Sequence, residues 1–283
     1  MTTANRLTRL QDMFNVNRFI GQFYLVGFVT KVDIHGKPYV QITLSDATAN
    51  AQLYCIDQAC IYGDIQPESY VDIEAQCISA SKMPYFRCKF IQPCDLSTRR
   101  ISNIYKLPVA RCAYPHVLAQ FIELVESITT PALSDFLSNV LLNNELGFKF
   151  IQCPASLNHH HNYRSGLLVH SVEVAKQVAN DKTLNKEERE LGIIAALLHD
   201  IGKTQTFTAD MTRSDLGYLV DHSELTLELC APALNVLSKA HLGYANQLRH
   251  AWTCASPNAR YGFKAKTKVA QLLQHYDASS ANR

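Results

Sequence analysis

The residues best suited to chemistry are histidines and aspartates at three separated positions of the chain. An apolar run ends in His199 and Asp200, and Lys203 follows within the stretch AALLHDIGKT. His170 lies in GLLVHSVEVA and Asp277 in LLQHYDASS, and all three stretches space their apolar residues as a helix does. Imidazole and carboxylate groups that converge in a helical core are what a divalent metal site needs. The sequence therefore indicates a metal site, provided that folding brings the three stretches together.

Helices are expected to position these residues. The apolar spacing predicts helices at 167–179 and 191–199, with a charged turn at 180–189 between them. The interval from His170 to His199 is long enough for two antiparallel helices and a loop. That arrangement returns the second helix beside the first, so the two histidines can meet.

The rest of the second half of the chain also has helical spacing. Further helical segments are expected at 116–128, at 131–142 with Pro131 in a first turn, around His222, around His250, and at 266–276. The polar stretch 204–216 is too long for a simple connection and is a candidate lid or substrate loop. We predict an all-helical domain over residues 113–283.

The first half of the chain has the alternation of β-strands instead. Strands are expected at residues 23–32, 39–44, 51–56, 70–78 and 85–91. Five strands in so short a stretch suit a small closed barrel such as an OB-fold, although other five-stranded barrels are also compatible. We assign the barrel to residues 19–92, with a helical lead-in at 1–18 and a linker at 93–112.

Aromatic residues and cations alternate on the predicted strands. Tyr39, Tyr54 and Tyr85 could stack on the bases of a single strand, while Lys89 lies near its phosphates. The competing interpretation is that strands favour aromatic residues in any case, and that alternating charges only solvate one face.

Composition narrows the class of protein. The chain has 283 residues, 47% of them hydrophobic, and a net charge of +2, so a large basic face is not indicated. Nine cysteines stand at irregular spacing without a CxxC pair, which is typical of reduced thiols. No secretory leader and no apolar run of about 18 residues is present. We expect a soluble cytoplasmic protein that does not enter a membrane.

Three consecutive histidines, His159 to His161, precede the first predicted metal ligand. They could ligate metal, bind phosphate, or lie on a loop in solvent, which is the usual place for an isolated triplet. Arg164 and His170 follow closely, and this favours a site.

The ordered set of His170, then the HDIGK motif, then Asp277 resembles the signature of the HD-domain metal-dependent phosphohydrolases. With the barrel before it, the chain resembles the YhaM-type 3′-to-5′ exoribonucleases. The stretches that carry this likeness are HGKPYVQITLSDATANAQLY, NHHHNYRSGLLVHSVEVA and GYLVDHSELT. The helical half is also similar to the HD domain of TraI-type proteins of conjugative elements, in CPASLNHHH and DASSA.

The resemblance implies which residues hold the metal. It implies a first metal ion held by His170, His199, Asp200 and Asp277. It implies that Asp200 bridges to a second ion, whose further ligands are His222 and His250. From the chemistry of these groups, we expect Asp200 and Lys203 to act in catalysis, and the candidates for binding substrate phosphates are His160, His161, Arg164 and Lys203. The expected cofactor is one or two divalent ions, Mn, Fe, Ni, Zn or Mg.

The chain departs from the family pattern just after His250. A paired-His motif is usual there, whereas this chain has Ala255, Ser256 and Pro257, so the second metal site is expected to be weakened or missing. Ser165 also replaces the first glycine of the usual GGLL.

These observations predict a metal-dependent 3′-to-5′ exonuclease acting on single-stranded RNA or DNA presented by the barrel. Two alternatives stay open: an HD-type nucleotide phosphohydrolase, and a non-catalytic nucleic-acid-binding protein of a mobile element. The sequence also leaves open whether copies of the chain assemble into a homo-oligomer.

Overall fold

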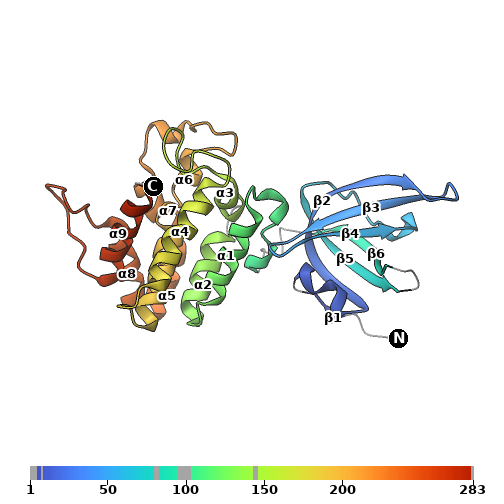
Figure 1. Cartoon of the computed structure of the whole chain (residues 1–283), viewed down its shortest axis with the longest axis horizontal. Helices are drawn as coiled ribbons and strands as arrows, with labels where there is room; N and C mark the ends of the chain where they lie inside the picture. Colours follow the sequence, from blue (N-terminus) through green and yellow to red (C-terminus); the bar gives the residue numbers. More distant parts are fainter. Residues whose placement is uncertain (1–4, 8, 80–82, 95–102, 143–145, 282–283) are drawn as a thin grey trace. The chain divides into compact units, whose positions relative to one another are not determined.

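The computed structural model describes residues 5–7, 9–79, 83–94, 103–142 and 146–281. The chain divides into two compact units, Met1–Ala110 and Arg111–Arg283. The first unit holds the strands and the second holds the α-helices (Figure 1). The predicted fold class, a five-stranded barrel followed by a helical domain, is confirmed.

The five long strands of the first unit form a closed barrel. They are β2 (Arg18–Val32), β3 (Pro38–Ser45), β4 (Asn50–Cys55), β5 (Ser69–Ile78) and β6 (Tyr85–Pro93). Antiparallel pairing joins β2 to β3, β3 to β4 and β5 to β6, and parallel pairing joins β4 to β6. Strand β2 also pairs with β5, which closes the sheet. The alternation in β3 buries Val40, Ile42 and Leu44 in the core.

Closure of the barrel depends on the length of β2. Its first half pairs with β5 from Arg18 to Leu25, and its second half pairs with β3 from Tyr24 to Val32. The register with β3 shifts between Leu25 and Gly27. Such an irregularity bends a strand, so a single strand can serve both edges of the sheet.

The segments that flank the strands pack onto the barrel. The expected helical lead-in contains the two-residue strand β1 (Asn5–Arg6) and the 3₁₀ helix η1 (Leu10–Asn15), which buries Leu10 and Met13 in the barrel core. A further 3₁₀ helix, η2 (Gln58–Cys60), follows β4.

The expected linker lies partly outside the described residues, at 95–102. Its described part holds the 3₁₀ helices η3 (Ile104–Lys106) and η4 (Val109–Arg111). The Tyr70 hydroxyl donates to the carbonyl oxygen of Lys106 at 2.7 Å, and the Ala47 amide donates to that of Tyr105 at 2.8 Å. The chain around η3 is therefore bonded to the barrel.

The second unit is helical. Its elements are α1 (Pro115–Glu126), α2 (Pro131–Leu141), α3 (Leu146–Gln152), α4 (Gly166–Asn180), α5 (Lys186–Leu198), α6 (Lys203–Thr206), the 3₁₀ helix η5 (Leu216–Tyr218), α7 (His222–Ala240), α8 (Leu242–Thr253) and α9 (Lys268–Ala281). Pro131 lies in the first turn of its helix, as predicted. None of the helices in the described ranges is both long and apolar enough to span a membrane.

Helices α4 and α5 pack side by side, and α9 packs against both (Figure 1). Gly192 of α5 allows the close approach, because a β-carbon there would lie 2.6 Å from Cγ1 of Val178 on α4. The predicted pairing of the helices that carry His170 and His199 is thus present.

Helix α5 begins earlier than the sequence analysis predicted. The charged residues 186–189 were expected to belong to a turn, but they form the first turn of α5. Asn185 accepts a hydrogen bond from the Glu188 amide at 2.9 Å, and the Glu188 carboxylate accepts one from the Asn185 amide at 3.1 Å. This reciprocal capping satisfies the first free amides of the helix, so its polar first turn is stable.

Glu190 of α5 is only 2% exposed and holds the start of α2. Its carboxylate accepts hydrogen bonds from the Thr129 hydroxyl at 2.8 Å, the Thr129 amide at 3.2 Å and the Thr130 amide at 3.0 Å. Burial disfavours the charge, but these donors outweigh it and lower the pKa of Glu190. The ionised carboxylate therefore stabilises the fold.

We expect Glu190→Ala to lower the free energy of unfolding at neutral pH by about 2–3 kcal/mol, because it removes the charged acceptor of three hydrogen bonds. Because the pKa is lowered in the folded state, this stabilisation is complete above the unfolded value of about 4.3 and is lost as the pH falls through the folded value. Urea unfolding at neutral and acidic pH measures the difference. The control is Lys186→Ala, which removes a partner that is 75% exposed, and an equal loss in both variants would contradict the role of Glu190.

Candidate metal centre

Three side chains from three helices meet at one point of the helical unit. His170 lies on α4, His199 follows the last residue of α5, and Asp277 lies on α9. The two Nε2 atoms are 3.1 Å apart. Oδ1 of Asp277 lies 3.1 Å from Nε2 of His170 and 3.4 Å from Nε2 of His199. All three donor atoms fall within 4.8 Å of one another.

Asp200 lies beside this group, with its two oxygens facing different partners. Oδ2 is 3.5 Å from Nε2 of His199, 3.7 Å from that of His170, and 2.5 Å from Nζ of Lys203. Oδ1 is 3.3 Å from Nε2 of His222, at the start of α7. This carboxylate therefore stands between the three-residue group and the side chain of His222.

Gly202 fixes the turn that carries His199 and Asp200. A β-carbon at this position would lie 1.9 Å from the carbonyl oxygen of His222, so only glycine allows α7 to begin so close. The Gly202 amide donates to Oγ1 of Thr226 at 3.1 Å, and the Thr226 hydroxyl donates to the carbonyl oxygen of His199 at 3.0 Å. The close packing of α7 against this turn therefore explains why the HDIGK motif has a glycine at this position.

A second layer of contacts orients the two imidazoles. Nδ1 of His199 lies 2.7 Å from the carbonyl oxygen of Ala196, which can only accept, so this nitrogen carries the proton. Nδ1 of His170 lies 3.3 Å from the Ser280 hydroxyl, which donates to Oε2 of Glu173 at 3.2 Å. Both Nε2 atoms are thereby left facing the centre, which is how metal-binding histidines are held.

The pKa values of the two histidines of the cluster shift in opposite directions. Burial lowers the pKa of His170. Burial also opposes the charge on His199, but the carboxylates of Asp200 and Asp277 outweigh it and raise the pKa to about 9. Asp200 is buried and Asp277 is partly exposed, yet neighbouring imidazoles, and Lys203 at Asp200, hold the pKa values of both carboxyls well below the ordinary range. The cluster thus keeps two carboxylates ionised next to the histidines.

These distances suit a divalent ion. Nitrogen and oxygen ligands lie about 2.1 Å from such ions, so neighbouring ligands at right angles are about 3.0 Å apart. The separations of 3.1, 3.1 and 3.4 Å are close to this value. The group of His170, His199 and Asp277 therefore fits a divalent metal ion, and Asp200 is a candidate fourth ligand.

His250, expected near a second ion, has a backbone partner. Its Nε2 accepts a hydrogen bond from the Lys266 amide at 2.9 Å, at the end of α8. A role as metal ligand requires that bond to break. Among the described residues, Ala255 lies in an extended bridge to Lys264 rather than in a ligand pair.

Of the residues expected to bind phosphate, two are exposed and one contacts residues around His170. His160 and Arg164 are exposed, and Nη2 of Arg164 lies 3.0 Å from the amide oxygen of Gln152 once that amide is oriented to accept. Nε2 of His161 lies 3.2 Å from the Glu173 carboxylate, and its Nδ1 lies 2.8 Å from the Tyr163 hydroxyl. His161 thus contacts the second layer around His170, while His160 stays in solvent.

Sequence reasoning missed that second layer. Glu173 stands three residues after His170, and Ser280 three residues after Asp277, which is one helical turn in each case. Polar residues one turn from a predicted ligand, on otherwise buried helix faces, were the available signal.

The barrel has a groove of its own. A cavity of about 480 Å³ is lined by three tyrosines, Tyr39, Tyr54 and Tyr85, together with Asp33, Lys37, Pro38, Ile56, Met83 and Pro84. The ring centroids of Tyr39 and Tyr54 are 6.0 Å apart, and those of Tyr54 and Tyr85 are 5.6 Å apart. The three predicted tyrosines therefore lie together, with Lys37 as the cation beside them, while Lys89 is exposed and outside the lining.

Comparison with known families bears on the helical unit. Residues 167–282 match the family described as HD domain, a stretch that contains all the residues of the cluster. This chain carries an HD domain. HD domains bind divalent metals, in agreement with the donor set found here.

Two relatives extend the likeness beyond the HD domain. One is a 3′-5′ exoribonuclease YhaM of Halalkalibacterium halodurans, 24% identical over 86% of this chain and 79% of the relative. The other is a 3′-5′ exoribonuclease YhaM of a Geobacillus species, 24% identical over 93% of this chain and 82% of the relative. Each alignment is too long to be confined to the HD domain, so the likeness includes residues that precede it.

Metal content tests the cluster. We expect His170→Ala and Asp277→Asn each to lower the amount of metal that copurifies with the chain. Each change removes one donor, and the donors that remain bind an ion more weakly than the full set. Inductively coupled plasma mass spectrometry on folded, desalted protein gives ions per chain. The matched control is His275→Ala, an exposed histidine on the same helix as Asp277. Unchanged metal content in both cluster variants would show that the ion binds elsewhere.

Proposed function

We propose that this protein is a metal-dependent 3′-to-5′ exonuclease acting on single-stranded nucleic acid, with RNA as its first substrate. The observation that carries the proposal is the convergence of His170, His199 and Asp277 in an HD domain. Support also comes from two exoribonuclease relatives that align over most of the chain. The fold adds a barrel with a tyrosine-lined groove suited to single strands.

The proposed centre joins four ligands, His170, His199, Asp200 and Asp277. A divalent ion held there would lower the pKa of water enough to supply hydroxide near neutral pH. The position of Asp200 between this group and His222 would suit a bridging carboxylate if a second ion binds. Mn, Fe, Ni, Zn and Mg all remain candidates, since histidine and carboxylate donors accept each of them.

In the proposed reaction, water is consumed at the last phosphodiester of the strand. The oxygen of hydroxide forms a bond to phosphorus while the bond from phosphorus to O3′ breaks. The departing O3′ takes up a proton, so the shortened strand ends in a 3′-hydroxyl. The terminal residue leaves as a nucleoside 5′-monophosphate, and no oxidant or reductant is needed.

We assign Lys203 to charge neutralisation at the phosphate. Its Nζ lies 2.5 Å from Asp200 and is mostly shielded from solvent, where a fixed positive charge acts strongly on developing negative charge. His222 approaches from the opposite side of Asp200. The phosphate is thus expected to meet the cation of Lys203 next to the ion.

Cleavage polarity tests this function. With Mn²⁺ and a short single-stranded RNA labelled at its 5′ end, we expect a ladder of products that shorten from the 3′ end. Asp200→Asn should lower the rate of cleavage by about 100-fold or more, which is the loss typical of removing a group that stabilises charge in the transition state. The control is Asp135→Asn, at an exposed aspartate of α2.

Each other outcome of that experiment favours another function. Hydrolysis of mononucleotides alone would point to a nucleotide phosphohydrolase. Binding of the RNA without hydrolysis under any metal would point to a binding protein. Internal cuts at the earliest times would exclude an exonuclease.

The barrel groove makes a separate prediction. We expect Tyr54→Ala to weaken binding of a short single-stranded RNA by roughly 5- to 100-fold, since a stacked base contributes about 1–3 kcal/mol. Hydrolysis of bis-p-nitrophenyl phosphate should not change, because this ester needs no groove. Fluorescence anisotropy measures the first and absorbance the second. Tyr62→Ala, at a tyrosine that is 52% exposed and outside the groove, is the control; equal effects of the two variants would refute the assignment.

A further inference from the structure

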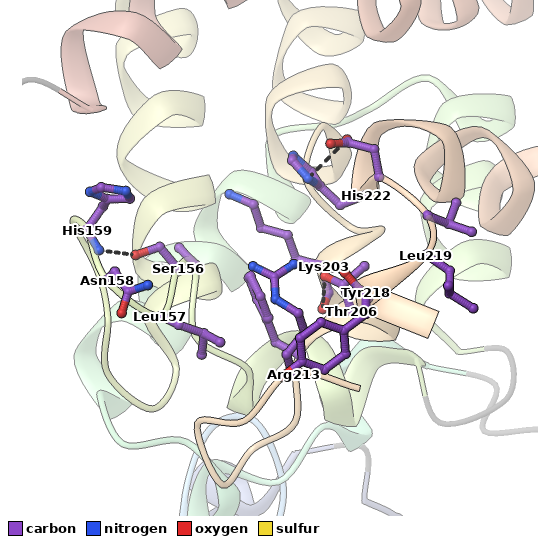
Figure 2. Close-up of a pocket in the computed structure, with 15 residues that line it drawn as sticks. Ser156, Leu157, Asn158, His159, Lys203, Thr206, Arg213, Tyr218, Leu219 and His222 are labelled. Carbon is purple, nitrogen blue, oxygen red and sulfur yellow. Dashed lines mark hydrogen bonds and ion pairs between the residues drawn. The ribbon is translucent and has the colours of Figure 1, made fainter. Parts of the chain in front are cut away.

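A second cavity, of about 500 Å³, lies on the helical unit next to the metal centre (Figure 2). Lys203 and His222 line it, and both of these side chains contact Asp200. Phe207, Arg213 and Tyr218 also line it, from the stretch that follows α6. The cavity is therefore continuous with the residues proposed for phosphate chemistry.

The stretch after α6 is braced by its own hydrogen bonds. Phe207 and Arg213 form an antiparallel bridge, and the Ser214 amide donates to the carbonyl oxygen of Thr206 at 2.9 Å. Gly217 packs so tightly that a β-carbon would lie 2.5 Å from the Thr206 carbonyl oxygen. The sequence allowed a lid or a substrate loop here, and this bonding favours a fixed wall for substrate.

Arg213 and Tyr218 present a cation and an exposed ring to the cavity. Nη1 of Arg213 donates to the carbonyl oxygen of Gly217 at 2.9 Å, and its guanidinium lies 5.2 Å from the ring of Phe207 and 5.7 Å from that of Tyr218. Tyr218 is 74% exposed. Figure 2 shows Lys203 and Arg213 in the same space, with Tyr218 beside Arg213 and His159 across from them. An exposed ring beside Arg213, in a cavity that Lys203 also lines, offers one surface to a base and two cations to its phosphate.

We propose that this cavity holds the terminal nucleotide of the strand, with its base stacked on Tyr218 and its phosphate facing Lys203 and Arg213. The volume lies in the range of about 300–1,000 Å³ that takes one small ligand, and a single nucleotide is such a ligand. The assignment rests on the proposed exonuclease function, because it places the released nucleoside 5′-monophosphate in this cavity. Tyr218 is a positioning residue of that reaction.

Binding of mononucleotides tests the proposal without requiring turnover. Isothermal titration calorimetry of the full chain with AMP and UMP in the presence of Mn²⁺ should show binding. Tyr218→Ala should weaken the affinity for both nucleotides by roughly 5- to 100-fold. Tyr218→Phe should retain most of the affinity, because it keeps the ring. Ribose 5-phosphate, which lacks a base, should bind wild type and Tyr218→Ala equally.

The matched control is Tyr261→Ala. Tyr261 is 76% exposed and has the guanidinium of Arg260 5.3 Å from its ring centroid, yet it does not line the cavity. Thermal unfolding confirms that each variant is folded, and truncation of so exposed a ring should leave stability nearly unchanged.

The results separate this proposal from the exonuclease assignment. No binding of AMP or UMP to wild type, or equal affinity in wild type and Tyr218→Ala, would overturn the nucleotide site. An equal loss for ribose 5-phosphate would also overturn it, because the effect would then not involve a base. Failure of the exonuclease assignment would instead appear as intact RNA with wild-type protein, whatever the mononucleotide affinities are.

Discussion

The close approach of two imidazole nitrogens, 3.1 Å apart, is the constraint on which the helical unit depends. At this distance the two nitrogens cannot both present a lone pair to each other, so either a proton on His199, whose pKa is raised, or a metal cation must lie between them. The carboxylate of Asp277 at the same point adds negative charge. His170 and Asp200 of the same centre are buried, and buried polar or charged groups are costly without compensation. A bound divalent ion supplies that compensation and would link α4, α5 and α9 in one step, so metal binding and stability of this unit are expected to be coupled.

The approach is possible only because backbone segments come unusually close. Gly192 brings α5 against α4, and Gly202 brings the start of α7 against the turn after α5. The first contact aligns the two histidines, and the second sets His222 beside Asp200. Glycine thus decides the geometry of a centre to which it contributes no ligand. This explains why the motif HDIGK needs its glycine as well as its histidine and aspartate.

The two units supply different parts of the proposed activity. The barrel has an aromatic groove with Lys37 as its neighbouring cation, a combination that tolerates any base because every base has a flat face. The helical unit has a cavity beside the ion, whose size suits one nucleotide. In the proposed function the barrel binds the body of the strand without regard to sequence, while the cavity next to Lys203 receives only its last residue.

The sequence by itself determined the fold class and which residues could meet. Period-two alternation predicted the barrel strands, and helical spacing predicted that His170 and His199 lie on neighbouring helices. Only the tertiary structure decided the rest, because contacts between distant segments leave no periodic signal. It tied His250 to the Lys266 amide and grouped Arg213 and Tyr218 into a cavity with Lys203. The early start of α5 is different, because its capping box of Asn185 and Glu188 is a local signal that the sequence already contained. Local spacing constrains which face of a helix a residue occupies, whereas its partners depend on how whole helices pack.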